Sequence, residues 1–148
     1  MQIEWRLKQF DDLTPYELYA ILQLRIEVFV VEQHCVFQDA DDKDQASYHL
    51  MGWQENKLVA YTRLVPPGHI YEQASIGRVV TSPSVRRFGA GKQLLQQSIN
   101  AVYQLFGHGP IKIGAQFYLK NFYKSFDFQQ ISDIYLEDGI EHIYMLKE

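Results

Sequence analysis

The first quarter of the chain changes from strand-like alternation to helical periodicity. Residues 3–10, IEWRLKQF, alternate apolar and polar positions, which is typical of a half-buried strand. A helix start follows, because Thr14 can cap the first turn, Pro15 suits its first position and Glu17 completes a capping box. Apolar side chains at helical spacing then predict one continuous helix over residues 16–33.

The middle of the chain predicts three strands and a second long helix. Residues 48–54 and 57–65 have the pattern of two strands joined by a tight turn. Residues 74–82 form a third β-rich run, which Pro83 ends. An amphipathic helix then continues to about Phe106, where a glycine follows.

The last third predicts a short strand, a short helix and a closing hairpin. The strand covers residues 111–116, the aromatic helix residues 118–126, and the hairpin residues 128–138 and 141–148. This order predicts an α+β protein whose central mixed, mostly antiparallel sheet has roughly six to seven strands, flanked by about four helices. No repeat or linker interrupts the pattern, so residues 1–148 are expected to form a single domain.

Composition narrows the class of protein. A formal net charge of −4 argues against a nucleic-acid partner, and no apolar run approaches the roughly 20 residues of a membrane span. Cys35 has no second cysteine to pair with, and the N-terminal residues lack a signal-peptide layout, so we expect a cytoplasmic protein. No grouping has the spacing of metal ligands. The chain has many aromatic residues, and we expect some of them to line a pocket or to form a homodimer contact.

A glycine-containing turn is the first sign of chemistry. Residues 85–95, VRRFGAGKQLL, place two glycines and three cations between a predicted strand and a predicted helix. Unpaired N–H groups and the helix dipole at such a point favour an anion, and Gly89 and Gly91 let the backbone approach it closely. The cations that would add charge are Arg86, Arg87 and Lys92. An ordinary turn with solvated cations is the alternative.

Known phosphate-binding patterns separate these alternatives. A P-loop is excluded because Arg86 and Gln93 stand where it needs a glycine and a Ser or Thr. A dinucleotide fingerprint is excluded because Leu94 replaces its third glycine. Residues 86–91, RRFGAG, fit the pattern Arg/Gln-x-x-Gly-x-Gly/Ala directly after a strand. They resemble the pyrophosphate loop of the GNAT superfamily of acyl-CoA N-acyltransferases.

A second motif supports the same resemblance. After its next strand the superfamily carries Asn-x-x-Ala-x-x-x-Tyr-x-x-x-Gly-Phe, and here Tyr123 and Phe128 agree with it. The positions that depart from it are Gln116, Leu119 and Asp127, the last of which replaces a glycine. Longer segments, such as residues 24–44 and 114–128, are similar to the ElaA-like group of bacterial N-acetyltransferases.

The resemblance implies a fold, a cosubstrate and a binding site. It implies a GNAT-like N-acetyltransferase that uses acetyl-CoA and an amine acceptor, either a small molecule or a peptide. A backbone N–H near Val79 or Val80 would polarise the thioester carbonyl. Gln116 or Asn121 would offer an amide to the pantetheine arm. The residues implied to bind the diphosphate are Arg86, Arg87, Phe88, Gly89, Ala90, Gly91 and Lys92.

The resemblance also assigns proton transfers. Tyr123 is the candidate general acid, because a phenol can protonate a departing thiolate. The base stays open among Glu32, His142 and His49, with a water chain as a further option. A different class of function also stays open. It is a non-catalytic module that senses acyl-CoA or binds a partner, and Asp127 is the departure that motivates it.

Three arginines lie in otherwise apolar elements. Buried arginines need carboxylate partners, so we expect structural pairs for two of Arg25, Arg63 and Arg78. The third could bind a substrate carboxylate instead. We expect the acidic run to be a solvated loop, with attraction of a cationic amine as the alternative. Its members are Asp39, Asp41, Asp42 and Asp44.

Overall fold

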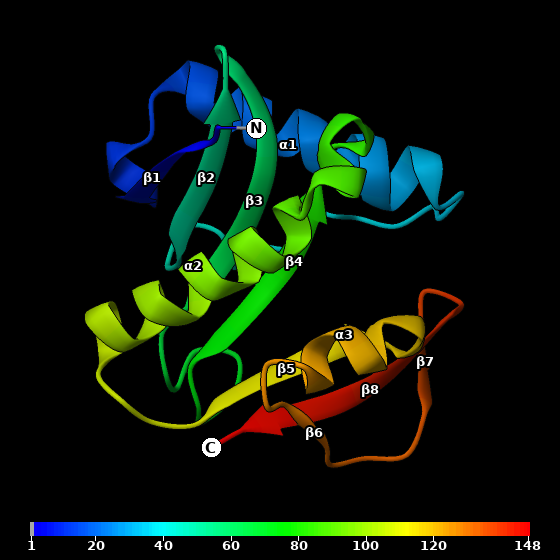
Figure 1. Cartoon of the computed structure of the whole chain (residues 1–148). Coiled ribbons are helices and arrows are strands. Elements are labelled where there is room, and N and C mark those ends of the chain that lie inside the picture. Colours follow the sequence, from blue (N-terminus) through cyan, green and yellow to red (C-terminus); the bar gives the residue numbers. More distant parts are fainter. Residues whose placement is uncertain (1) are drawn as a thin grey trace.

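The strands form two antiparallel sheets that diverge from one point of contact. A computed structural model describes residues 2–148. The first sheet has the order β1-β2-β3-β4, and the second has β5 and β6 on either side of β8, with β7 also pairing with β8. Between the sheets, a parallel bridge joins Ala74 to Ile111, and β4 and β5 then separate (Figure 1). The expected α+β class with mostly antiparallel pairing is confirmed.

The elements follow the order that the sequence predicts. The strands are β1 (Glu4–Gln9), β2 (Tyr48–Gln54), β3 (Lys57–Val65), β4 (Ser75–Thr81), β5 (Ile111–Gln116), β6 (Gln129–Gln130), β7 (Tyr135–Glu137) and β8 (Ile140–Lys147). The α-helices are α1 (Pro15–Arg25), α2 (Ala90–Phe106) and α3 (Lys120–Lys124). The shorter helical turns are η1 (Phe10–Asp12), η2 (Ile26–Glu32), η3 (Pro83–Phe88) and η4 (Phe117–Leu119).

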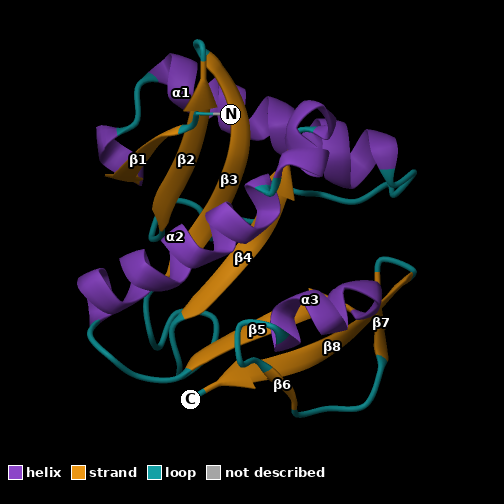
Figure 2. Cartoon of the chain, viewed as in Figure 1, coloured by secondary structure: helices purple, strands orange, loops and turns teal. Residues whose placement is uncertain are grey.

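Helices α1 and α2 cover opposite faces of the first sheet. Leu94 and Ile99 of α2 pack in one apolar cluster with Ala60 of β3, whereas Ile21 of α1 packs in another with Tyr61. Adjacent strand residues point to opposite faces, so the two clusters lie on the two sides of the sheet. Helix α3 covers the second sheet on the same side as α2 (Figure 2). On the other face of the second sheet, Gln116 and His142 line the opening.

The first helix does not keep one geometry over its whole predicted length. Its start is as predicted, because Glu17 N donates to Thr14 Oγ1 at 3.1 Å and Thr14 N donates to Glu17 Oε1 at 2.9 Å. After Arg25 the chain winds more widely, as a π-helix over η2. Such wide turns are rare and frequently occur at functional sites. Segment η2 lies against the opening between the sheets and contributes Val28, Phe29 and Glu32 to its wall.

Strand β4 contains a bulge at the edge of the opening. Val80 pairs with Tyr61 and Gly77 pairs with Arg63, so Arg78 and Val79 lie opposite one residue of β3. Arg78 has a φ of 52°, in the left-handed region. Bulges bend a strand and leave backbone groups outside the ladder, and they are common beside active sites.

Asp127 supplies the turn for which the related pattern uses glycine. Its φ is 71°, a left-handed conformation that aspartate tolerates better than most residues. Phe128 N donates to Tyr123 O at 3.2 Å, and the Phe128 side chain is buried. The Tyr123 and Phe128 rings pack edge to face, with centroids 6.0 Å apart. The departure at Asp127 therefore leaves this turn and its aromatic contact formed.

Candidate functional site

A cavity of about 910 Å³ occupies the opening between β4 and β5. Its walls come from residues 28–41, 76–91, 113–123 and 137–142, so four separate parts of the chain meet there. Many of the residues singled out from the sequence line it: Val79, Val80, Arg86, Gly91, Gln116, Tyr123, Glu32 and His142.

Other residues singled out from the sequence lie outside this wall. Arg87, Phe88, Gly89 and Lys92 are exposed around the glycine turn, and Ala90 is buried beneath it. Asn121 is exposed on α3, so the structure brings Gln116 rather than Asn121 to the cavity. His49 is buried elsewhere: its Nε2 donates to Asp44 O at 2.9 Å, and its Nδ1 accepts from the Tyr61 hydroxyl at 2.6 Å. These bonds use both ring nitrogens, and burial lowers the pKa of His49.

The glycine turn forms an open helix N-terminus at one end of the cavity. Segment η3 leads to Gly89, whose φ of 76° ends that turn and starts α2. Within residues 2–148, no side chain caps the first N–H groups of α2. A Cβ at Gly91 would lie 3.8 Å from Phe122 Cζ, an ordinary contact, so glycine here is not required by packing. The free N–H groups and the dipole of a 17-residue helix make this end suitable for an anion.

Arg86 already has a carboxylate partner. Its Nη1 and Nη2 donate to the two Glu32 carboxylate oxygens at 2.6 Å each, and Nη2 also donates to Thr81 O at 3.3 Å. The hydrogen bonds from Arg86 lower the pKa of Glu32, so this carboxylate is a weaker base than an ordinary glutamate. The sequence contains both residues, 54 positions apart, but no local pattern connects them.

Tyr123 lies at the cavity wall with its hydroxyl unbonded. The side chain is buried, and its ring packs edge to face on Phe122 with centroids 5.3 Å apart. Among residues 2–148 it has no hydrogen-bond partner. Burial raises the pKa of Tyr123, so the phenol stays protonated at every pH at which the protein would work. A protonated, unpaired phenol can donate to an atom that enters the cavity.

His142 lies on β8 of the second sheet, between Tyr135 of β7 and Gln116 of β5. It pairs in register with Tyr135 on one side and with Gln116 on the other. Its Nδ1 donates to Ile140 O at 2.8 Å, and its Nε2 lies 3.5 Å from Glu137 Oε2. The Gln116 side-chain amide exchanges two hydrogen bonds of 3.2 Å with that of Gln33, which ties the end of η2 to β5.

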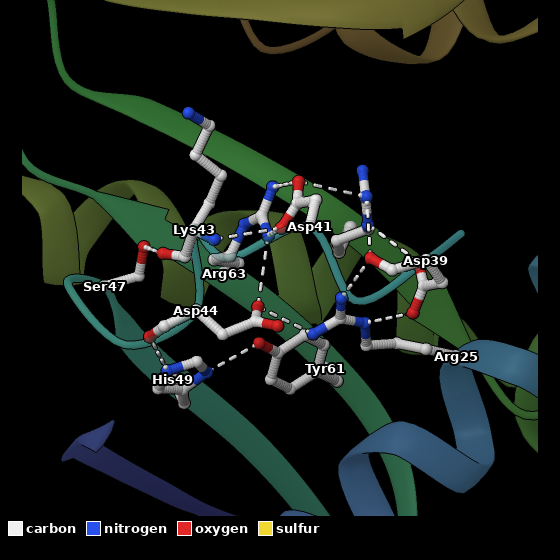
Figure 3. Close-up of polar contacts among 10 residues, drawn as sticks. Arg25, Asp39, Asp41, Lys43, Asp44, Ser47, His49, Tyr61 and Arg63 are labelled. Atoms are coloured by element: carbon white, nitrogen blue, oxygen red, sulfur yellow. Dashed lines mark hydrogen bonds and ion pairs between the residues drawn. The ribbon is translucent and has the colours of Figure 1, made fainter. Parts of the chain in front are cut away.

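The acidic run is not a solvated loop, and that expectation is wrong for three of its four members. Asp39, Asp41 and Asp44 fold inward and pair with three arginines of α1, β3 and β4 (Figure 3). Of the four, only Asp42 is exposed. All three arginines are therefore paired, one more than the sequence suggested.

The distances define a compact network of opposite charges. Arg25 Nε donates to Asp39 Oδ2 at 2.7 Å and its Nη1 donates to Asp44 Oδ1 at 2.8 Å. Arg63 Nη1 donates to Asp41 Oδ1 at 2.7 Å and to Asp44 Oδ1 at 3.1 Å. Burial alone would raise the pKa of Asp44, but hydrogen bonds from Arg25 and the charges of both arginines outweigh it and hold that pKa low.

Arg78 is the member of the network that also reaches the cavity. Its Nε lies 2.9 Å from Asp39 Oδ1, an ion-pair contact that lacks hydrogen-bond geometry, and its Nη2 donates to Asp39 O at 3.1 Å. Arg78 and Asp41 both line the cavity. Because three arginines face three aspartates, this wall presents no net charge.

Two absences hold for the part of the chain that the structure describes. Within residues 2–148, no helix is both long and apolar enough to cross a membrane. Across the same residues, no three His, Cys, Asp or Glu side chains are grouped as metal ligands.

Comparison with known proteins agrees with this geometry. The family model described as "Acetyltransferase (GNAT) domain" matches residues 15–148. Protein ElaA from Escherichia coli strain K12 is 40% identical over 148 residues, which cover 99% of this chain and 97% of ElaA. The crystal structure of E. coli ElaA superimposes with a TM-score of 0.93 and covers 99% of this chain and 100% of that one.

Two other solved structures have the same fold. An acyl-CoA N-acyltransferase from Pseudomonas aeruginosa is 42% identical, with a TM-score of 0.95 over 99% of this chain and 100% of that chain. A GNAT family acetyltransferase from Elizabethkingia anophelis, solved with acetyl-CoA bound, is 16% identical, with a TM-score of 0.66 over 99% of this chain and 97% of that chain. The second likeness concerns the fold alone.

Proposed function

Because this chain belongs to the GNAT acetyltransferase family, we propose that it transfers the acetyl group of acetyl-CoA to a primary amine of a small molecule or peptide. One observation carries the proposal. An uncapped helix N-terminus at Gly89–Gly91 opens into the cavity between β4 and β5, whose wall includes an unpaired phenol, Tyr123. The diphosphate would bind at the helix end and the extended arm would lie between the strands, with the thioester beside Tyr123.

The bulge in β4 suits polarisation of the thioester carbonyl. Arg78 and Val79 have no partner in register on β3, and β5 has already diverged on the other side of the strand. Of the two expected donors, Val79 lies outside the ladder whereas Val80 pairs with Tyr61, so the backbone N–H of Val79 can donate to the carbonyl oxygen as negative charge develops on it. This group is fixed by the strand and needs no reorganisation during the reaction.

The proposed chemistry is direct attack. The ammonium form of the acceptor gives one proton to a base, and the neutral nitrogen then forms a bond to the acetyl carbon. The carbon–sulfur bond breaks, the thiolate takes the Tyr123 proton, and the positively charged nitrogen of the adduct gives up a second proton, which returns to the phenolate through water as the amide forms. Among the candidate bases, His142 is favoured, because pairing with Arg86 lowers the pKa of Glu32 and His49 lies outside the cavity.

The direct test is acetyl-CoA binding and thiol release with a panel of primary amines. Release that depends on an amine supports the transferase. Tight acetyl-CoA binding without release on any amine would support the alternative, a non-catalytic acyl-CoA sensor. No binding of acetyl-CoA at all would contradict both.

Gly91→Val is expected to weaken CoA binding by at least about 10-fold, since a branched side chain would stand where the diphosphate approaches the helix end. The free energy of unfolding should not fall, because a Cβ at this site meets only Phe122, at 3.8 Å. Titration calorimetry with CoA and urea unfolding measure the two quantities. Gln97→Val, farther along the same helix, is the control. Unchanged CoA affinity in Gly91→Val would contradict the loop assignment.

Glu32→Gln is expected to tighten CoA binding by about 1.5- to 5-fold, because Arg86 no longer has a competing carboxylate and a half-exposed ion pair contributes only about 0.2–1 kcal/mol. Arg86→Gln should weaken binding instead. Turnover of Glu32→Gln should stay within about three-fold of the wild type if His142 is the base. A fall of about 100-fold would assign the base to Glu32.

A further inference from the structure

The orientation of His142 is fixed by its surroundings. A carbonyl oxygen can only accept, so the 2.8 Å contact with Ile140 O places a proton on Nδ1. The Tyr135 ring stacks on the imidazole with an interplanar angle of 26°. The side chain is 9% exposed. In the neutral ring, Nε2 therefore carries a lone pair and lines the cavity without a hydrogen bond to any of residues 2–148.

The Glu137 carboxylate places a second hydrogen-bond acceptor beside His142 Nε2. Its carboxylate lies 3.5 Å from His142 Nε2 and is 60% exposed. A carboxylate and an unprotonated imidazole nitrogen have no hydrogen to share, so neither satisfies the other. A group with several N–H donors and a positive charge would satisfy both. A primary ammonium group has that chemistry.

Most of the charge on the cavity wall is balanced by nearby partners, but the negative charge beside His142 is not. Four acidic residues line the cavity, and two of them are neutralised: Glu32 by Arg86, and Asp41 by Arg63 and Arg78. Glu137 and Asp138 have no Lys or Arg partner among the described residues. Glu137 ends β7 and Asp138 begins the turn to β8, so the uncompensated negative charge of the cavity is concentrated beside His142.

We propose that Glu137 binds the ammonium group of the acceptor and holds it against His142 Nε2, which takes its proton. This inference rests on the proposed function and deepens it, since it makes the acceptor a cationic primary amine and makes Glu137 the residue that recognises it. One proton moves from the ammonium nitrogen to Nε2, and the carboxylate then faces the imidazolium and stabilises its charge. The neutral amine left beside the pair is the nucleophile.

The test compares Glu137→Gln with Glu141→Gln, an exposed glutamate of β8 outside the cavity wall. Each removes one charge from the same hairpin. The acceptors are the best substrate from a panel of alkylamines, diamines and amino-acid amides, and hydroxylamine, which is mostly uncharged at neutral pH. Glu137→Gln should raise the KM for the cationic amine by about 10- to 100-fold and change kcat by less than about three-fold, because a charged hydrogen bond is lost. In the same variant, the fold increase in the KM for hydroxylamine should be at least about ten-fold smaller than the fold increase for the cationic amine.

His142→Asn separates recognition from proton transfer. The asparagine amide can still donate a hydrogen bond to Ile140 O, but the variant has no Nε2. Turnover of the cationic amine should fall by about 100-fold or more. Turnover of hydroxylamine, which needs no prior deprotonation, should fall much less. Acetyl-CoA affinity, measured by calorimetry, should match the wild type in all three variants.

The outcomes distinguish the two proposals. If Glu137→Gln and Glu141→Gln behave alike with every acceptor, or if Glu137→Gln affects hydroxylamine as strongly as the amine, the ammonium site is wrong and the transferase stands. If the wild type binds acetyl-CoA but transfers to no nucleophile, both proposals fail.

Discussion

Asp44→Asn is expected to lower the free energy of unfolding by about 3–5 kcal/mol, because it leaves Arg25 and Arg63 facing a neutral amide inside the protein. That is a large part of the roughly 5–15 kcal/mol that holds an ordinary domain together. Urea unfolding at neutral pH measures the loss. Partial unfolding at room temperature would be consistent with the upper end of the range.

The same loop provides the control. Asp42→Asn removes an equal charge two residues away, where the side chain is exposed and asparagine accepts the left-handed backbone. Its cost should stay within about 0.5 kcal/mol. Equal losses in the two variants would mean that the buried pairs contribute nothing specific and that the loop responds only to net charge.

The network also sets the acid limit of the fold. Burial would raise the pKa of Asp41 and of Asp44, but the hydrogen bonds and charges of the arginines outweigh it and lower both. The stabilisation is therefore complete above the unfolded-state pKa of about 3.9 and is lost as the pH falls through the lower folded-state values. Wild-type stability should decline steeply only below about pH 4, and the decline should be shallower in Asp44→Asn.

Tyr123→Phe is expected to reduce kcat for acetyl transfer by about 100- to 10,000-fold, because the departing thiolate loses its proton donor. The acetyl-CoA affinity should change little. The hydroxyl has no hydrogen-bond partner among residues 2–148, so its removal should change the free energy of unfolding by less than about 1 kcal/mol. Steady-state kinetics, calorimetry and urea unfolding measure the three quantities.

Tyr118→Phe is the matched control for that experiment. Tyr118 also lines the cavity, but its side chain is largely exposed. A loss of kcat shared by both variants would point to a general change in the cavity. Full activity in Tyr123→Phe would remove the phenol from the mechanism.

Features formed by residues only a few positions apart could be predicted from the sequence, because each has a recognisable short pattern. The capping box at Thr14 and Glu17 forms as its spacing requires. The turn at Glu55 and Asn56 has φ values of 49° and 66°, the left-handed pair of a tight hairpin. The glycine turn lies between β4 and α2, where the motif placed it.

Features that depend on distant partners could not be predicted. The acidic run and the three arginines were both visible, but their pairing joins positions 14 to 39 residues apart through the folded loop. The Arg86 contact with Glu32 spans 54 residues and changes the interpretation of both side chains. Glu137 was not singled out, because its meaning comes only from its distance to His142.

The divergence of β4 and β5 has a consequence for solubility. A strand edge exposes unpaired N–H and C=O groups that can recruit a foreign chain and begin aggregation. Here the two edges face each other across the cavity and meet at the bridge between Ala74 and Ile111. A thin, extended molecule can enter and bond to both edges, whereas a whole sheet from another protein cannot, so the opening protects the edges that it leaves unsatisfied.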